Sequence, residues 1–430
     1  MSQGNATDYR AMWADLGLDL AKHDALLAAL GQMYQDVYLS QADRPESMRY
    51  FDFVMSEVHG LRVKELLDAQ AAGRRVVGTF CVFVPEELVL AVDGVTVGLC
   101  AGAEFGTEAA ERYLPRNTCA LIKSFFGFTL EKVCPYTAAC DLVVGENTCD
   151  GKKKSYEHFG GMVKRFYLMD MPQMKSTAGR ALLTGEYRRF ASELEELSGR
   201  EVTVEGLRRG IKTINAKRAA IRRLNQLRAA DPTPISGRDA LLIQQVSFYD
   251  DPVRFTGSVN AVCDELERRI AARQGTAPAG RPRILISGCP MAVPNWKLPP
   301  IVEAAGAVIV GEESCIGMRG LRNEVSTEGD TVAGLIENLV DRYFRIDCAT
   351  FTPNPERIGH IREMAEELGA DGVIHYALQF CSPYQIESVK VEEQVERGGV
   401  PVLRIDTDYG SEDVEQLRTR VEAFVERIAR

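Results

Sequence analysis

A short apolar segment that ends in a cysteine occurs four times in this chain of 430 residues and constrains its fold more than any other feature. Two of these segments end at Cys81 and Cys149 in the first half, and two end at Cys289 and Cys381 in the second. A residue that ends a strand of an open α/β sheet faces the crevice beyond the carboxyl ends of the strands, where ligands bind. The pattern therefore predicts two related α/β halves, each presenting thiols at one edge of its sheet.

The spacing of apolar and helical segments predicts an α/β fold with two pseudo-repeated domains and an N-terminal helical cap. Each α/β domain is expected to hold a mainly parallel four-stranded sheet flanked by helices. The predicted strands lie near 75–82, 95–100, 141–146 and 164–169, and near 283–288, 306–311, 371–377 and 400–406. The predicted domains are a helical cap over 1–72, a first α/β domain over 73–190, a helical segment over 191–275 and a second α/β domain over 282–430.

The helical segment contains a basic stretch from Leu207 to Arg228 with apolar residues along one side. The apolar spacing predicts that this side packs against the core. We interpret the basic residues as the solvated face of a packed helix. Docking of an acidic partner is the alternative.

The overall charge limits the classes of partner. A net charge of −10 and a pI near 5.3 argue against nucleic acid or an anionic membrane as the main partner. No apolar stretch approaches the length of a membrane helix, and the amino terminus lacks a signal-peptide pattern. We therefore expect a cytoplasmic protein. In that reducing compartment the eleven cysteines are not expected to form a disulfide framework, so metal ligation or catalysis becomes their natural use.

Six cysteines lie at a predicted strand end or helix start, beside Gly, Pro or a capping residue, and we predict that they form a ligand site. They are Cys81, Cys119, Cys149, Cys289, Cys315 and Cys381. Four others are interpreted as buried apolar residues, namely Cys100, Cys140, Cys263 and Cys348. Cys134, which precedes Pro135, is an alternative ligand.

The spacing of these cysteines distinguishes between metals. The chain has no C-x-x-C pair and only five histidines, so a structural zinc site is disfavoured. The contiguous cysteine runs of ferredoxins are also missing. Thiolates that come from separate loops at a domain cleft favour an iron–sulfur centre. Cysteines that are incidental core or loop residues, and another metal or thiol chemistry, are the alternatives.

Several motifs are similar to those of the 2-hydroxyacyl-CoA dehydratase and benzoyl-CoA reductase superfamily, over most of the chain. They begin at Cys81 (Cys-Val-Phe-Val-Pro), at Asp141 (Asp-Leu-Val-Val-Gly-Glu-Asn-Thr-Cys), at Leu168 (Leu-Met-Asp-Met-Pro) and at Phe380 (Phe-Cys-Ser-Pro-Tyr). Within the superfamily, Gly288-Cys-Pro and the segment from Gly311 to Arg319 resemble the double-cubane cluster proteins more closely than the dehydratase subunits.

The resemblance implies an iron–sulfur site. Dehydratase subunits hold one [4Fe–4S] cluster by three cysteines, which Cys81, Cys119 and Cys381 match best, and leave one iron open for a thioester carbonyl. The three-cysteine pattern of the dehydratase subunits does not account for Cys149, Cys289 and Cys315. Six thiolates would hold three irons in each of two cubanes, and a sulfide that bridges the remaining irons gives the [8Fe–9S] double cubane of the resembled proteins.

The resemblance also implies a partner, a homodimeric activator that carries its own [4Fe–4S] cluster and hydrolyses ATP. The chain has neither a P-loop nor a G-x-G-x-x-G motif, so the ATP chemistry is expected on that partner. We expect an oxygen-sensitive, homodimeric, ATP-dependent reductase for a small substrate. One alternative is a 2-hydroxyacyl-CoA dehydratase (a lyase) or aryl-CoA reductase subunit with a single [4Fe–4S] cluster. A non-catalytic maturation or electron-storage protein is the other.

Proton donors and nearby cations are predicted less strongly. Weak candidates for proton donors are Glu146, Glu312, Glu313 and His375, although a hydrogen-bonded core histidine is the favoured interpretation of the last. Lys152, Lys153 and Lys154 could offset the negative charge of a thiolate-rich cluster or attract an acidic surface of the activator. A solvated helix start is the favoured interpretation of these lysines.

Overall fold

The computed structural model describes residues 8–429, and two four-stranded parallel sheets form its centre. The first sheet has the order β2-β1-β3-β4 and the second has the order β6-β5-β7-β8. The strands are β1 (Val76–Thr79), β2 (Val95–Gly98), β3 (Leu142–Glu146), β4 (Phe166–Met169), β5 (Arg283–Gly288), β6 (Val308–Glu313), β7 (Gly372–Leu378) and β8 (Val402–Thr407). The strand order is the same in both halves, so the predicted α/β fold is confirmed.

The central strands explain why apolar runs marked them in the sequence. Every residue of β3 and β7 is buried, as in parallel sheets that are covered on both faces. β6 differs from its prediction because it continues to Glu313 rather than ending near 311. The two extra residues are acidic, and buried arginines hold both of their carboxylates.

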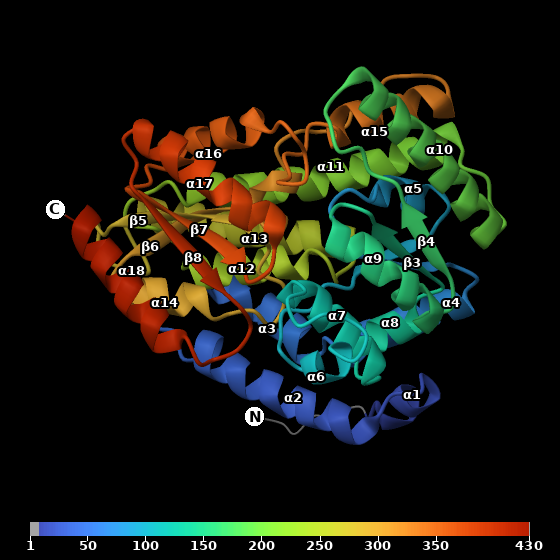
Figure 1. Cartoon of the computed structure of the whole chain (residues 1–430), viewed down its shortest axis with the longest axis horizontal. Helices are drawn as coiled ribbons and strands as arrows, with labels where there is room; N and C mark the ends of the chain where they lie inside the picture. Colours follow the sequence, from blue (N-terminus) through green and yellow to red (C-terminus); the bar gives the residue numbers. More distant parts are fainter. Residues whose placement is uncertain (1–7, 430) are drawn as a thin grey trace.

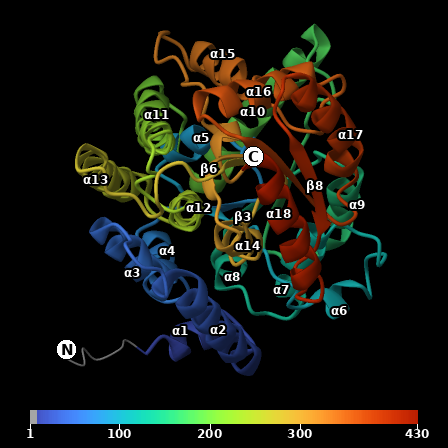
Figure 2. The same ribbon diagram turned by 90° about the vertical axis from the view of Figure 1, so that its left-hand side faces the viewer.

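Helices flank both sheets (Figure 1). In the first half they are α5 (Glu86–Ala91), α6 (Thr107–Ala110), α7 (Ala120–Leu130), α8 (Pro135–Ala139), α9 (Asp150–Phe159) and α10 (Thr177–Ser198). In the second half they are α14 (Leu298–Ala304), α15 (Val332–Tyr343), α16 (Pro355–Glu367), α17 (Ser382–Arg397) and α18 (Val414–Ile428). An N-terminal helical region precedes the first sheet, with α1 (Arg10–Asp15), α2 (Leu20–Tyr34), α3 (Arg49–Ser56) and α4 (Leu61–Ala71). Figure 2 shows α1 and α2 along one outer edge.

The predicted helical segment forms α11 (Val204–Leu227), α12 (Gly237–Val246) and α13 (Pro252–Ala271). The basic stretch lies on α11, but its interpretation as a solvated face is wrong for three residues. Lys217 and Arg218 are buried and pair with Glu86 and Glu87 of α5, whereas Arg228 is buried against Glu312. Acidic partners from distant parts of the chain neutralise these cations, and the local sequence does not show those partners.

Among residues 8–429, no helix is both long and apolar enough to cross a membrane. The proposed domain bounds stay a prediction, and residues 1–7 of the predicted helical cap lie outside the described residues.

Candidate functional site: a cysteine-lined cavity

A cavity of about 1530 Å³ lies beyond the carboxyl ends of strands from both sheets. Eight cysteines line it, namely Cys81, Cys100, Cys119, Cys149, Cys289, Cys315, Cys348 and Cys381. All six of the cysteines that we predicted to form a ligand site are among them, and their role as ligands stays a prediction. Cys134 is not among the lining residues; it caps α8, where its sulfur accepts hydrogen bonds from Thr137.

The eight cysteines occupy four equivalent positions in each half. Three positions follow corresponding strands, and the fourth lies in the connection between the second and third strands of each half. The pairs are Cys81 with Cys289 after β1 and β5, Cys100 with Cys315 after β2 and β6, Cys149 with Cys381 after β3 and β7, and Cys119 with Cys348. Cys348 is buried in the core and Cys100 packs against it, as we interpreted them, but both residues also line the cavity. The signal that could have found Cys100 is its offset from β2, which equals that of Cys315 from β6.

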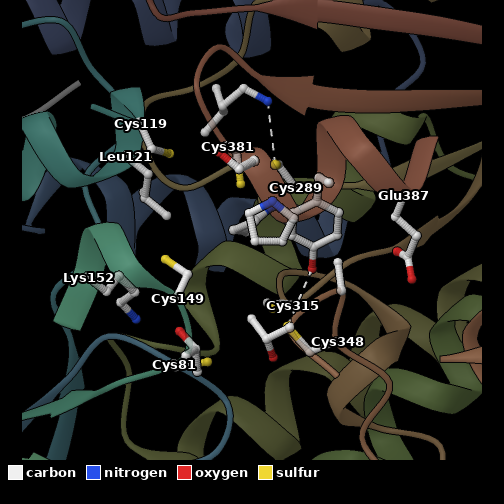
Figure 3. A pocket seen from close by; sticks show the side chains of 18 of the residues that line it. Cys81, Cys119, Leu121, Cys149, Lys152, Cys289, Cys315, Cys348, Cys381 and Glu387 are labelled. Carbon is white, nitrogen blue, oxygen red and sulfur yellow. Dashed lines mark hydrogen bonds between the residues drawn. The ribbon is translucent and has the colours of Figure 1, made fainter. Parts of the chain in front are cut away.

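The thiols form two groups, each with members from both halves of the chain. Cys119 and Cys289 both hydrogen-bond with Cys381, and together they form the first group. In the second group Cys81 hydrogen-bonds with Cys315, whose charge also acts on Cys348. That charge acts on Cys100 as well, but the Cys100 thiol donates to the carbonyl oxygen of Phe80. Figure 3 shows the first group towards one end of the cavity, the second towards the other, and Cys149 between them.

Helix starts support several of these sulfurs. Cys119, Cys149 and Cys381 are the residues that precede the first turns of α7, α9 and α17. The backbone N–H groups of Leu121 and Ile122 act to lower the pKa of Cys119, and those of Gly151 and Lys152 act to lower the pKa of Cys149. Such N–H groups stabilise thiolates. The hydrogen bond with Cys381 and burial nevertheless keep the pKa of Cys119 raised, and burial keeps the pKa of Cys149 raised, so both are neutral thiols until a metal binds.

Arg319 adds a buried positive charge to the second group. Its Nη1 donates to Cys315 Sγ at 3.5 Å, and its Nε donates to Glu313 Oε1 at 2.8 Å. The hydrogen bond with Cys81 and the charge of Arg319 lower the pKa of Cys315 to about 6, although burial opposes the shift. The same hydrogen bond raises the pKa of Cys81. Of the two sulfurs, Cys315 therefore carries the shared negative charge, because the guanidinium contacts it directly.

Lys152 is the corresponding cation from the first half. Its ammonium lies 3.0 Å from Glu146 Oε2 and 5.9 and 5.8 Å from the ring centroids of Phe80 and Tyr156. Burial acts against the charged form, but Tyr156, Glu146 and nearby thiols outweigh it and raise the pKa of Lys152. Lys153 and Lys154 are exposed, as expected for a solvated helix start, although Lys153 also lines the cavity. That interpretation is wrong for Lys152, which lines the cavity with a largely buried side chain.

None of the four weak candidates for proton donors is among the cavity-lining residues. Glu312 accepts hydrogen bonds from Arg228 and Gln244, and Glu313 pairs with Arg319 and Arg357. Glu146 accepts a hydrogen bond from Lys152, which lies between it and the cavity.

His375 is buried in β7, where its Nε2 lies 3.3 Å from the carbonyl oxygen of Tyr384. Burial, followed by the charge of Arg357, lowers its pKa to about 3. His375 is therefore neutral near pH 7 and fits the interpretation as a core histidine.

The helices α16 and α17 form part of the cavity wall. They carry Arg362, Lys390, Glu387 and Glu393, beside Ile386, which is 76% exposed.

The donor set fits an iron–sulfur cluster better than a single ion. Within residues 8–429, no three His, Cys, Asp or Glu side chains are placed to hold one metal ion. In a cubane the thiolates bind different irons, so they surround a larger group and need not converge on one point. Two groups of three thiols in a large cavity meet that requirement, and soft thiolate donors suit iron–sulfur clusters.

The fold and the cavity define an α/β protein whose two similar halves share a thiol-rich site. The chain belongs to the family described as "2-hydroxyglutaryl-CoA dehydratase, D-component", whose model matches residues 81–428. It is 36% identical over 366 residues to the putative dehydratase subunit YjiM of Escherichia coli strain K12, covering 84% of this chain and 94% of that protein. The membership confirms the resemblance at the level of the superfamily.

Two further relatives differ in the reaction that their descriptions give. The (R)-phenyllactyl-CoA dehydratase beta subunit of Clostridium sporogenes is 26% identical, with 84% of this chain and 93% of the relative covered. A benzoyl-CoA reductase subunit of Thauera aromatica is 24% identical, with 83% and 91% covered. The family thus includes both dehydratase and reductase subunits.

Proposed function

We propose that this protein is a low-potential reductase that holds an [8Fe–9S] double-cubane cluster and reduces a small substrate. The observation that supports this proposal is the presence of two three-thiol groups in one cavity. Three thiolates occupy three irons of a cubane, so two groups suit two cubanes that share a bridging sulfide. When bound, such a cluster supplies electrons at low potential.

The two groups also suggest how the ligands are divided. We assign Cys119, Cys289 and Cys381 to one cubane and Cys81, Cys315 and Cys348 to the other. This set differs from the sequence-based set in one member, because Cys348 takes the place of Cys149. We place Cys348 with Cys315, whose charge acts on it, and its sulfur lies 3.8 Å from the hydroxyl of Tyr384. The charge of Cys119 acts on Cys149, but Cys149 lies between the two groups (Figure 3).

Electrons for the cluster come, in this proposal, from a separate ATP-hydrolysing activator with its own [4Fe–4S] cluster. Family membership supports this division of labour, as does the lack of a P-loop in the sequence. The protein works as a cytoplasmic homodimer under anaerobic conditions.

The second candidate is a 2-hydroxyacyl-CoA dehydratase or aryl-CoA reductase subunit with a single [4Fe–4S] cluster. The descriptions of the relatives favour it. Metal analysis after anaerobic purification separates the two candidates, because the double cubane requires about eight irons per chain and the single cubane about four. A protein that is free of iron after strictly anaerobic purification would refute both.

Turnover separates either enzyme from an electron-storage protein. The purified protein is mixed anaerobically with the activator, ATP, a strong reductant and candidate small substrates. An enzyme converts substrate over many cycles while the activator hydrolyses ATP, whereas a storage protein accepts electrons and stops.

A further inference from the structure

Lys152 is a buried lysine whose charged group reaches the wall of the cavity. Only 12% of its side chain is exposed, and the residue lines the cavity beside Cys149 and Cys81. The bond to Glu146 uses one of the three N–H groups of the ammonium. At least part of its hydrogen-bonding capacity is therefore available to a group within the cavity.

The bonding of Glu146 indicates that its pair with Lys152 has a use other than stability. Glu146 is fully buried, and no described residue bonds to its Oε1. A buried carboxylate is costly unless its oxygens are well bonded. Glu313 shows the well-bonded case, since Arg319, Arg357 and Ser287 all bond to it. The Glu146–Lys152 pair is incompletely satisfied by comparison.

The orientation of the Glu146–Lys152 pair sets the sign of its electric field in the cavity. Lys152 lines the cavity, whereas Glu146 is not among the lining residues and lies behind it. Figure 3 shows the Lys152 ammonium on the side of the cavity where Cys149 and Cys81 lie. The positive end of the ion pair therefore faces the thiols.

We propose that Lys152 is a positioning residue that donates to the anionic sulfur face of the cluster on the Cys81 side and raises its reduction potential, with Glu146 holding the ammonium in place. This inference rests on the proposed iron–sulfur site. Reduction adds negative charge, and a fixed cation at short range in a buried site stabilises the reduced form. Hydrogen bonds to cluster sulfurs are among the factors that set cluster potentials.

The experiment measures the midpoint potential of the anaerobic full-length protein by redox titration followed by electron paramagnetic resonance, with iron analysis on each sample. Lys152→Met leaves Glu146 buried without its cation, so the deciding variant is the double replacement Lys152→Met/Glu146→Gln, which keeps the site neutral. We expect the double variant to titrate at a more negative potential than the wild type. The expected size is a tenfold or greater fall in the ratio of reduced to oxidised cluster at the wild-type midpoint, which is about 59 mV for one electron.

Two further variants test the sign and the chemistry. Glu146→Gln removes a negative charge and leaves the ammonium, so its potential is expected to move in the positive direction. Lys152→Arg retains the charge and is expected to stay close to the wild type. If the double variant fails to bind iron, the midpoint potential of Glu146→Gln tests the inference by itself. An unchanged potential in that variant would overturn the inference.

The control is Lys154→Met, which removes the same charge from an exposed residue on the same helix. It is expected to leave the potential unchanged, and a shift as large as that of the double variant would show that a lysine charge changes the potential without lining the cavity. A fully loaded double variant with the wild-type potential would show that the ion pair is only structural. These results are distinct from an iron-free wild type, which would refute the proposed cluster itself.

Discussion

Replacement of Arg319 by methionine tests how the second thiol group is charged. The pKa of Cys315 is about 6, against a reference value of 9.0, under the influence of Cys81 and then Arg319. Three units correspond to roughly 4 kcal/mol at about 1.36 kcal/mol per unit. Arg319 accounts for part of this, so we expect Arg319→Met to raise the pKa of Cys315 by about one unit or more. Each unit above the working pH lowers the thiolate fraction about tenfold.

The assay is alkylation of the metal-free protein by a small reagent across a pH series, with modification of Cys315 quantified by mass spectrometry. In the wild type the rate is expected to rise with a midpoint near pH 6, because the thiolate is the reactive form. In Arg319→Met the midpoint moves upward. Arg322→Met is the matched control, since Arg322 pairs with Glu363 near the surface. Equal midpoints in wild type and Arg319→Met would refute the reasoning.

The same pKa shift makes a prediction about stability. A thiol whose pKa is lower in the folded state than in the unfolded state stabilises the fold above the unfolded value. For the metal-free protein this contribution of Cys315 is fully present above about pH 9 and is lost as the pH falls through about 6. Arg319→Met should therefore flatten the dependence of the unfolding free energy on pH between these values. Circular dichroism at each pH would establish whether the variant is folded.

Three further predictions concern other parts of the molecule. Cys348→Ser should lower the iron content of the anaerobic protein by up to one cubane, about four irons, whereas Cys149→Ser should retain it; the reverse result would restore the sequence-based ligand set. Arg228→Met leaves Glu312 buried without its cation and should destabilise the fold by about 3–5 kcal/mol, as measured by denaturant unfolding, with Arg228→Met/Glu312→Gln recovering part of the loss. His375→Gln should leave the pH profile of turnover between pH 5 and 8 unchanged, because His375 is already neutral there. If one limb of the pH profile disappeared in the variant, His375 would have to titrate in that range.

Local signals were sufficient to predict the sheets and six of the cavity cysteines. The apolar runs of β3 and β7 are buried along their whole length, and parallel strands bring their carboxyl ends to one edge. Cys149 and Cys381 follow those strands at the same offset, so an analysis of single segments could find them. Cys348 was missed because it follows α15 rather than a strand, and only the shared topology of the two halves relates it to Cys119.

Charged residues were harder to place because burial depends on partners that are distant in sequence. Arg218 faces Glu87, 131 positions earlier, and Arg228 faces Glu312, 84 positions later. Three consecutive lysines lie near the start of α9, and their spacing does not reveal which of them is buried at the cavity. Lys152 is buried there because Glu146, at the end of β3, fixes its ammonium.

The two buried cations make the thiol groups electrostatically unequal. Lys152 responds to the charge of Cys81, and Arg319 contacts Cys315, so both cations act on the second group. In the first group, by contrast, the hydrogen bonds that act on Cys119 come from Cys381 and from backbone N–H groups. Positive charge stabilises added electrons, so in a double cubane the first electron is expected on the side of Cys81 and Cys315.

This inequality can be measured where two reductions are resolved in one titration. The double variant Lys152→Met/Glu146→Gln should then shift the first midpoint potential more than the second, because the cation that it removes lies beside the cubane that is reduced first. Equal shifts of both potentials would mean that the charge acts on the cluster as a whole. The assignment of the first electron to one side of the cavity would then be wrong, whereas the ligand groups themselves would be unaffected.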